Sequence, residues 1–297
     1  MEKKIIRNEF YIPPVGFGTW PLKGSELESC METAVSVGYR LFDTADNYGN
    51  EDSIGNVIAK NPQLRKELFI MTKISDEKSA NNRWSSTGKY FYKNSPYMQV
   101  HSCREVVDMI VEKSLRNLKT DYIDCLVMHW PYPDYMLEIW EEMIRLQERG
   151  VLRFIGVSNF RERHLEKIKQ NFSVYPIVNQ ICVSPLDTKK SLIDYCQSEE
   201  IQVLCYAPLQ TIRNVEYVQD SLVCEILKKY GISLAELLLA WNANQNIVPI
   251  VKSTNKERMQ KNMNASEIKL DFNDVSALSA LNKNMQYLPE SLFCPGC

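Results

Sequence analysis

The sequence carries almost no net charge and no long hydrophobic run. Its 35 Lys and Arg are balanced by 37 Asp and Glu, which gives a formal charge of −2 and a pI near 6.0. Binding to nucleic acid or to an anionic membrane through the whole surface needs an excess of basic charge and is therefore excluded. Nowhere do about 18 uncharged apolar residues follow one another, and no apolar stretch of signal-peptide length follows the first charges. We expect a cytoplasmic protein with no nucleic-acid or membrane partner.

Histidine is scarce, and the cysteines show no ordered spacing. No two of the three histidines have the His-x-x-x-His spacing of a helical zinc site, so we expect no metal. The nine cysteines are an odd number without framework spacing, as expected of reduced thiols that act as small buried hydrophobes. Cys294 and Cys297 form a Cys-x-x-Cys pair. This pair could be a redox pair or half of a metal site. The alternative is a pair without function, which the absence of a second pair with ligand spacing favours.

What the sequence does contain is a regular alternation of short apolar runs and helical periodicity. With 297 residues, 44% hydrophobic and 24% charged, the chain can form a large core, although its length leaves the number of domains open. Residues between most of the runs repeat apolar positions with helical spacing. The eight runs, each a candidate strand, cover residues 15–18, 40–43, 68–73, 122–129, 153–158, 176–180, 202–206 and 247–251.

Eight strand-then-helix units predict an α/β fold, a single (β/α)8 TIM barrel. Parallel strands need a crossover after each strand, and eight such units close a barrel. No composition break or linker divides the chain, so we expect one domain over residues 1–297. The alternative is a doubly wound open sheet with a glycine-rich turn for phosphate. Gly16 and Gly18 supply only half of that fingerprint, and Pro21 occupies the place of its third glycine.

Two stretches depart from the alternation. Residues 75–101, after the third strand, are polar and aromatic without a clear period, and an enlarged loop of this length is usually a lid or a binding loop. We predict a lid over the active site. Residues 282–297 are rich in apolar side chains but contain Pro289 and Pro295 and are too short for another unit. We expect this tail to fold over the barrel mouth.

Polar side chains recur where the predicted strands end. In a (β/α)8 barrel the working residues lie at the carboxyl ends of the strands. The second, third and fourth strands end in Asp43, Lys73 and His129, and Tyr48 follows in the turn after the second. The later strands end in Ser158 and Asn159, in Gln180, in Tyr206, and in Lys252 and Ser253.

The first four residues suit a site in which a phenol acts as an acid. Tyrosine has a reference pKa near ~10, so an adjacent ammonium such as Lys73 is needed to stabilise the phenolate of Tyr48. Asp43 is placed to pair with Lys73 and keep it charged, and a neutral His129 could polarise a carbonyl oxygen. Each residue alone also has a structural interpretation: an ion pair, a core histidine or a turn aromatic. Their occurrence together at successive strand ends favours the catalytic interpretation.

Taken in order, the motifs around these residues resemble those of the aldo-keto reductase family. The similarity covers nearly the whole chain and implies reduction of an aldehyde or ketone with NADPH, reversibly and without a metal. It implies that Asp43, Tyr48, Lys73 and His129 are the catalytic tetrad, with Tyr48 as proton donor. The motifs are 38–51, 71–73, 128–131, 156–160, 179–180 and 251–253 with Arg258.

The resemblance also implies which residues hold the cofactor and the substrate. Ser158, Asn159 and Gln180 match carboxamide-binding positions, and Tyr206 matches the residue that stacks on the nicotinamide. The further cofactor candidates are Thr19, Trp20, Leu209, Thr211, Thr254 and Asn262, beside Lys252, Ser253 and Arg258. The substrate candidates, mostly aromatic, are Trp20, Tyr48, Trp84, His129, Trp130 and Tyr287.

The charges and helix signals around residues 252–258 agree with a cofactor that carries a phosphate. Thr254 and Glu257 have the spacing of a capping box, which places Lys252 and Ser253 before a helix N-terminus that favours an anion. A 2′-phosphate would give Arg258 a bidentate target that NADH lacks, so NADPH is preferred. A solvated basic helix start is the alternative. Lys261 stands where the family often has Glu, which leaves the adenine contacts open.

Two other classes of function compete with a reductase that acts on a small carbonyl or alcohol as a monomer or weak homodimer. A cofactor-binding sensor or interaction subunit on the same barrel would show little turnover, and the intact tetrad argues against it. A metal- or phosphate-dependent lyase or isomerase is disfavoured because metal ligands are missing.

Overall fold

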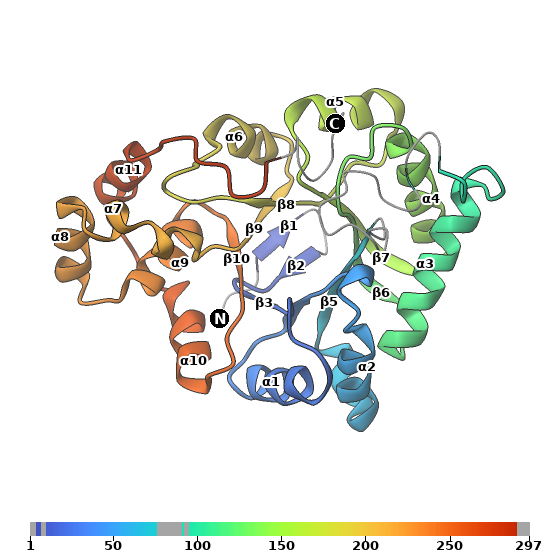
Figure 1. The fold of residues 1–297 in the computed structure, drawn as a ribbon, viewed down its shortest axis with the longest axis horizontal. Helices are drawn as coiled ribbons and strands as arrows, with labels where there is room; N and C mark the ends of the chain where they lie inside the picture. Colours follow the sequence, from blue (N-terminus) through green and yellow to red (C-terminus); the bar gives the residue numbers. More distant parts are fainter. Residues whose placement is uncertain (1–3, 7–9, 76–90, 92–94, 290–297) are drawn as a thin grey trace. The chain divides into compact units, whose positions relative to one another are not determined.

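The computed structural model describes residues 4–6, 10–75, 91 and 95–289, and hydrogen bonds connect eight of its strands into a closed barrel. The order around the barrel is β10-β3-β4-β5-β6-β7-β8-β9, and the strands of the pairs β5–β6, β6–β7, β9–β10 and β10–β3 run parallel. Figure 1 traces these elements in chain order. Their bounds are β3 Gly16–Gly18, β4 Leu41–Asp43, β5 Phe69–Ile74, β6 Ile123–Met128, β7 Leu152–Ser158, β8 Val178–Cys182, β9 Gln202–Tyr206 and β10 Val248–Val251.

The predicted (β/α)8 barrel is confirmed, and the open-sheet alternative is wrong. Every barrel strand falls within two residues of the run that predicted it. The strands β5 and β6 are buried at all six positions, as expected of parallel strands that are covered on both faces. The sequence did not predict an antiparallel hairpin of β1 (Lys4–Ile6) and β2 (Phe10–Ile12), which is a separate two-stranded sheet.

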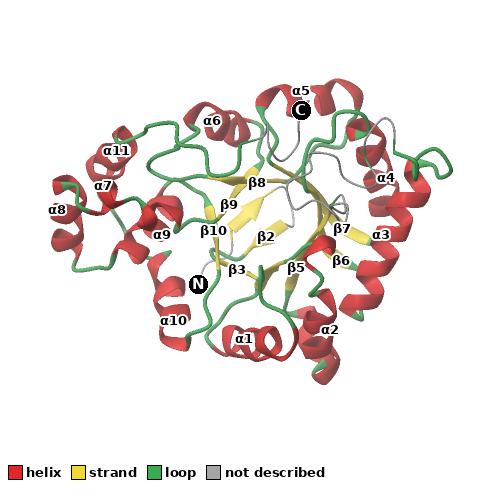
Figure 2. Cartoon of the chain, in the orientation of Figure 1, coloured by secondary structure: helices red, strands yellow, loops and turns green. Residues whose placement is uncertain are grey.

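Helices follow the strands, as the periodicity predicted (Figure 2). Two of them begin with capping boxes, Ser102 with Glu105 and Ser233 with Glu236, which satisfy backbone N–H groups of the first turn. The helices are α1 Gly24–Ser36, α2 Glu51–Lys60, α3 Cys103–Leu118, α4 Met136–Glu148, α5 Glu162–Asn171, α6 Lys190–Ser198, α7 Val215–Val218, α8 Ser221–Tyr230, α9 Leu234–Asn244, α10 Lys256–Ala265 and α11 Phe272–Ala280. Three short 3-10 helices are η1 Asp46–Tyr48, η2 Pro62–Lys66 and η3 Gln210–Arg213.

The chain divides into two compact units. Unit 1 comprises residues 1–18, 33–41 and 180–287, and unit 2 comprises residues 19–32, 42–179 and 288–297. Within unit 2, α3 packs on β5, and α4 packs on β6 and β7. Within unit 1, α6 packs on β9, α9 packs on β10 and α10 packs on α9. The expectation of one domain over the whole chain stays a prediction.

The core of each unit is tightly packed. In unit 1 a Cβ on Gly16 would lie 2.3 Å from Cδ1 of Ile250, so this close approach of β3 to β10 requires glycine. Of the seven described cysteines, six are buried and Cys224 is exposed. Burial raises the pKa of Cys103 and that of Cys205 to about 12, so these thiols stay protonated. The buried, unreactive character predicted for most cysteines is confirmed for these residues.

The lid and the tail are described only in part. Residues 76–90 and 92–94 of the predicted lid lie outside the described residues, and so does Trp84. In the tail the N–H groups of Lys283 and Met285 both donate to the carbonyl of Leu186, in the loop after β8. Residues 290–297, with Cys294 and Cys297, lie outside the described residues, so the fold of the tail end stays a prediction.

Candidate active site

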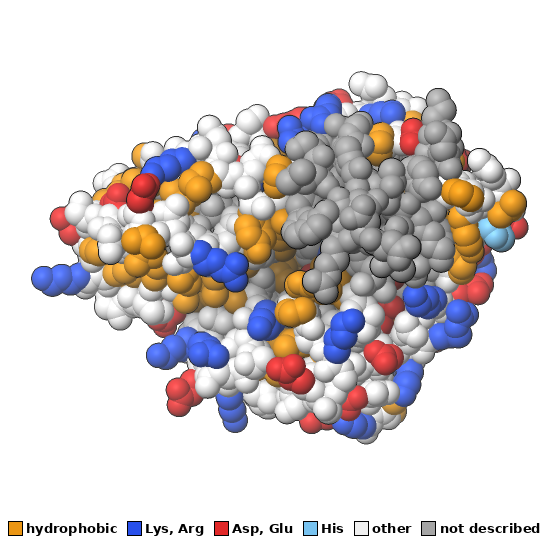
Figure 3. All heavy atoms as spheres, viewed as in Figure 1, with side chains coloured by type: hydrophobic (Ala, Val, Ile, Leu, Met, Phe, Trp, Pro, Cys, Tyr) orange, Lys and Arg blue, Asp and Glu red, His pale blue; other side chains and the backbone are white. Residues whose placement is uncertain are grey.

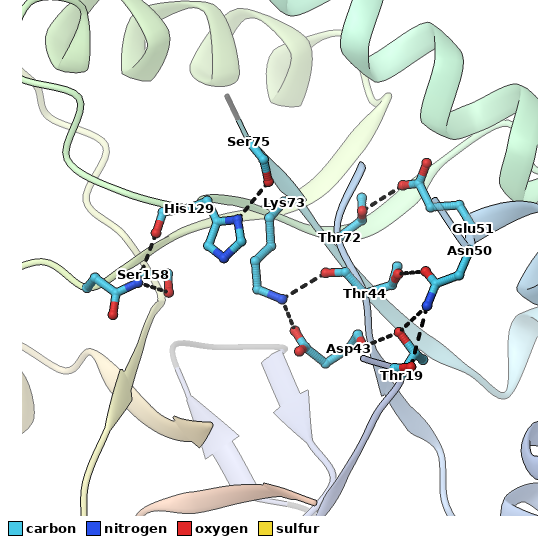
Figure 4. A network of polar contacts seen from close by, with 11 residues as sticks. Thr19, Asp43, Thr44, Asn50, Glu51, Thr72, Lys73, Ser75, His129 and Ser158 are labelled. Carbon is cyan, nitrogen blue, oxygen red and sulfur yellow. Dashed lines mark hydrogen bonds and ion pairs between the residues drawn. The ribbon is translucent and has the colours of Figure 1, made fainter. Parts of the chain in front are cut away.

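A buried ammonium lies at the centre of the candidate site, which is contained in unit 2. Lys73 extends from β5 with an exposed fraction of 0%, and its Nζ donates to Asp43 Oδ1 at 2.6 Å and to the Thr44 carbonyl at 2.8 Å (Figure 4). Although burial acts to lower the pKa of Lys73, the Asp43 carboxylate and Tyr48 outweigh it, and the net direction is upward. Lys73 therefore keeps its positive charge, and its predicted pairing with Asp43 is confirmed.

The phenol of Tyr48 lies beside this ammonium. Lys73 Nζ is 5.1 Å from the centre of the Tyr48 ring. Burial raises the pKa of Tyr48, while the charge of Lys73 and its hydrogen bond to the phenol act to lower that pKa. The residue types predict that the ammonium dominates, whereas the net shift of the Tyr48 pKa is upward because desolvation of the phenolate outweighs the cation. Tyr48 thus holds its proton at neutral pH, as a proton donor must, and the ammonium reduces the cost of releasing it.

His129 follows β6 and also lies close to Tyr48. The two ring centres are 6.1 Å apart, and the rings meet edge to face. The Nδ1 atom of His129 is 2.6 Å from Ser75 Oγ. The His129 carbonyl accepts a hydrogen bond from Asn159 Nδ2, which also donates to Ser158 Oγ, at 3.1 Å in both cases. The barrel therefore brings all four predicted catalytic residues to one place, while their individual roles stay predictions.

A network of buried polar side chains supports the turn that carries Tyr48. The Thr19 N–H and Oγ1 both donate to the Asp43 carbonyl at 3.0 Å. Asn50 Nδ2 donates to Thr19 Oγ1 at 3.2 Å, and Thr44 Oγ1 donates to Asn50 Oδ1 at 2.7 Å (Figure 4). The hydroxyl of Thr19 is thus used inside the protein, and its contact with a cofactor stays a prediction.

The aromatic substrate candidates are placed unequally. Trp20 has an exposed fraction of 57%, and its ring centre is 5.1 Å from that of Tyr48, so an apolar surface borders the phenol. Trp130 follows His129 directly and is half-buried. Tyr287 belongs to unit 1 and is 44% exposed. Trp20 is therefore the best-supported substrate contact among them.

The predicted phosphate-binding residues lie together in unit 1, at the end of β10 and the start of α10. Lys252 and Arg258 are exposed there, and Ser253 is buried, with its Oγ accepting a hydrogen bond from the Asn255 N–H at 3.1 Å. The predicted capping box of Thr254 and Glu257 is wrong. The cap is Asn255, whose Oδ1 accepts from the Arg258 N–H at 2.9 Å, because the backbone of Asn255 is still extended. The helix begins one residue later than expected, with Arg258 in its first turn.

Two buried polar groups of unit 1, one of them on the cofactor candidate Thr211, suit a polar ligand. Thr211 Oγ1 and the phenol of Tyr217, from the segment after β9, are buried without a hydrogen-bond partner among the described residues. Such atoms suit a ligand with polar groups. Asn262 is buried and hydrogen-bonds the phenol of Tyr39, whose pKa burial raises in spite of that bond. Tyr206 ends β9, as predicted from the sequence. Gln180 was predicted to end its strand but lies inside β8, which continues to Cys182, and Leu209 precedes η3.

Two polar residues of unit 2 near the site were missed by the sequence analysis. Asp46 and Glu51 are buried carboxyl groups, with Glu51 Oε1 accepting a hydrogen bond from Thr72 Oγ1 at 2.7 Å. Burial raises the pKa of both, that of Asp46 to about 8. An acidic residue between Asp43 and Tyr48 was the available signal.

The part of the chain that is described lacks two features of other functional classes. Within that part, no three His, Cys, Asp or Glu side chains are grouped as metal ligands. None of the described helices is long and apolar enough to cross a membrane. On the face drawn in Figure 3, the coloured basic and acidic side chains are interspersed, without a large patch of one sign.

Comparison with known proteins agrees with this geometry. The model of the Aldo/keto reductase family matches residues 14–283. A glyoxal reductase of Bacillus subtilis is 30% identical over 285 residues, which cover 96% of this chain and 94% of that protein. A methylglyoxal reductase of Escherichia coli O157:H7 is 30% identical over 281 residues, covering 94% and 93%. The crystal structure of an aldo-keto reductase from Bombyx mori in complex with NADP has a TM-score of 0.81 at 29% identity, covering 98% of this chain and 95% of that one.

Proposed function

This chain belongs to the aldo/keto reductase family, and we propose that it reduces small aldehydes and ketones to alcohols with NADPH. The observation that carries the proposal is the buried Lys73 ammonium, held by Asp43 and facing the Tyr48 phenol. Relatives named for glyoxal and methylglyoxal make α-dicarbonyl compounds the first substrates to consider.

The residues of unit 2 account for the proton half of the reaction. Tyr48 gives its proton to the substrate oxygen as negative charge develops there, and the Lys73 ammonium stabilises the phenolate that remains. His129 donates a hydrogen bond from its Nε2 to the same oxygen and polarises the carbonyl. The cofactor, when bound, supplies the hydride. The alcohol product can be oxidised by the reverse steps.

The residues of unit 1 support NADPH over NADH. We expect Lys252, Ser253 and Arg258 to hold the 2′-phosphate, because the start of α10 adds backbone N–H groups to two exposed cations. Gln180, Tyr206 and Thr211 are the expected contacts of the nicotinamide half, with Ser158 and Asn159. Monomer or weak dimer, and a cytoplasmic location, stay predictions.

The test is a reductase assay on the purified chain with a matched variant. We expect NADPH to be consumed with glyoxal or methylglyoxal, followed at the nicotinamide absorbance. Tyr48→Phe should lower kcat/KM by ~10²–10⁴-fold because the proton donor is lost, with NADPH binding by protein fluorescence unchanged. Tight NADPH binding without turnover of any carbonyl by the wild-type chain would instead favour a sensor.

A further inference from the structure

A second polar chain lies behind His129, on the side of the ring that faces away from the proposed substrate contact. Ser75, the first residue after β5, is 1% exposed, and its Oγ is 2.6 Å from Nδ1 of His129 (Figure 4). The Ser75 hydroxyl is also a hydrogen-bond partner of the Asp46 carboxyl. Asp46, Ser75 and His129 thus form a polar chain that the reaction as described does not use.

Asp46 is unusual among these three hydrogen-bonded residues because one of its carboxyl oxygens has no partner among the described residues. Its side chain is 7% exposed, and its Oδ1 is buried with no hydrogen-bond partner among the described residues. An ionised carboxylate with an oxygen unsatisfied in this way is costly, whereas a protonated carboxyl is less so. The placement in η1, which packs against α3 and β5, keeps water from that oxygen.

The charged groups around Asp46 come from three elements. Glu51 of α2 acts to raise the pKa of Asp46, and Lys113 of α3 acts to lower it. Tyr48 shares η1 with Asp46, and the charge of Asp46 acts to raise the pKa of Tyr48. Burial is the largest cause, and the pKa of Asp46 rises to about 8 in spite of the hydrogen bonds from Ser75 and the Asn47 backbone.

The direction of the hydrogen bonds follows from the single proton of a hydroxyl group. When Asp46 carries a proton it donates to Ser75 Oγ, Ser75 donates to His129 Nδ1, and the neutral ring keeps its proton on Nε2. When Asp46 is ionised, Ser75 donates to the carboxylate and accepts from Nδ1–H. The neutral ring then has no proton on Nε2 and cannot donate to a carbonyl oxygen.

We propose that Asp46 and Ser75 are positioning residues that set the tautomer of His129 and thereby make carbonyl reduction depend on the protonation of Asp46. This inference rests on the proposed function for its effect on turnover. The tautomer itself does not depend on that function. Reduction is fastest while Asp46 is protonated and declines as the pH rises through its pKa.

The first experiment reads the tautomer in the full chain without cofactor. We expect the nitrogen NMR signals of His129, assigned by comparison with a His129→Gln variant, to show a protonated Nε2 at pH 7 and a protonated Nδ1 at pH 9. In Asp46→Asn the tautomer of His129 should not change between pH 7 and pH 9, since the amide does not titrate. An unchanged tautomer in the wild-type chain, or a change that persists in Asp46→Asn, would overturn the proposal.

The second experiment reads turnover. We expect kcat/KM for methylglyoxal to fall about tenfold between pH 7 and pH 9 in the wild-type chain and to stay level in Asp46→Asn. Glu51→Gln is the matched control, because it removes a neighbouring carboxylate that is not bonded to Ser75. Its decline should remain and move to lower pH, since loss of the Glu51 charge lowers the pKa of Asp46.

The proposal is contradicted if kcat/KM of Asp46→Asn falls over the same pH range as that of wild type. It is also contradicted if kcat/KM of Glu51→Gln does not fall with pH. In a protein that already carries Ser75→Ala, Asp46→Asn should have no further effect. The double variant should therefore have the pH profile of Ser75→Ala alone. If the wild-type protein reduced no carbonyl compound, the proposed function would be wrong. The NMR experiment would still test whether Asp46 and Ser75 set the tautomer of His129.

Discussion

Unit 2 contains two buried ion pairs at opposite ends of its strands, and they differ in what their cations contact and in the polar groups beside them. Asp124, near the start of β6, accepts from Arg65 Nη1 at 2.7 Å, from Arg153 Nη1 at 2.8 Å and from the Ile70 N–H at 3.0 Å. Arg65 donates further to backbone carbonyls and lies 3.8 Å from the centre of the Tyr122 ring.

The second pair, Lys73 with Asp43, lies at the carboxyl ends of the strands. Lys73 is held by Asp43 and Thr44 but also faces the phenol of Tyr48, and nearby Asp46 Oδ1 has no partner among the described residues. The comparison teaches that a buried ion pair alone does not mark an active site. A pair whose cation also hydrogen-bonds a phenol, next to an unsatisfied carboxyl, does.

The largest expected effect comes from removing the cation that faces the phenol. Lys73→Met should lower kcat/KM for a carbonyl substrate by ~10²–10⁴-fold, because the phenolate of Tyr48 then loses its stabilising charge. Steady-state kinetics with NADPH measure this loss. Since the Lys73 ammonium lowers the pKa of Tyr48, the variant should also show that pKa moved upward. Turnover within about tenfold of wild type would show that the two ion pairs are alike in function.

The opposite pair should affect folding instead of chemistry. Arg65→Met leaves Asp124 buried beside a weaker set of partners, and we expect the free energy of unfolding to fall by ~3–5 kcal/mol. Urea denaturation measures this change, and kcat of the folded fraction should be unchanged. Arg153→Met is the matched control, with a smaller effect because that side chain is 52% exposed. A large loss of kcat in Arg65→Met would contradict the distinction between the pairs.

An exposed cation of unit 1 extends the comparison to ligand binding. Arg258→Ala should weaken NADPH binding by ~10–100-fold, the loss of charge-assisted hydrogen bonds to a phosphate, and leave NADH binding nearly unchanged. Fluorescence titration with both cofactors measures the two dissociation constants. Lys261→Ala, one turn further along α10, is the control for general charge. Equal weakening of NADPH and NADH by Arg258→Ala would show that the residue does not contact the 2′-phosphate.

The smallest expected effect concerns stability and pH. Asp46 has an ordinary pKa of 3.8 in an unfolded chain and about 8 in the folded one. Between these values the unfolded chain releases a proton that the folded chain keeps, so the free energy of unfolding declines as the pH rises from 4 to 8.

Asp46→Asn lacks this contribution. Relative to wild type, its free energy of unfolding should improve between these pH values, by at most ~1.4 kcal/mol for each pH unit. Urea denaturation at a series of pH values measures the difference. Parallel pH curves for the two proteins would show that Asp46 is not buried as a protonated acid.

The sequence by itself determined the barrel and most of its catalytic set. Strand periodicity is a local property, and parallel strands bring their carboxyl ends to one rim, so Asp43, Lys73 and His129 could be placed together from the ends of their runs. The hairpin of β1 and β2 was missed, because two runs of three residues give too short a period to recognise.

Tertiary structure alone decided the direction of the pKa shift at Tyr48 and the chain from Asp46 through Ser75 to His129. Ser75 opens a segment that the sequence marks only as a loop, and it meets His129 across 54 positions of the chain. The capping of α10 by Asn255 was likewise decided by which neighbouring side chain reached a free N–H. Residue types and spacing carry no information on desolvation or on such contacts, because both depend on what the folded chain packs around each group.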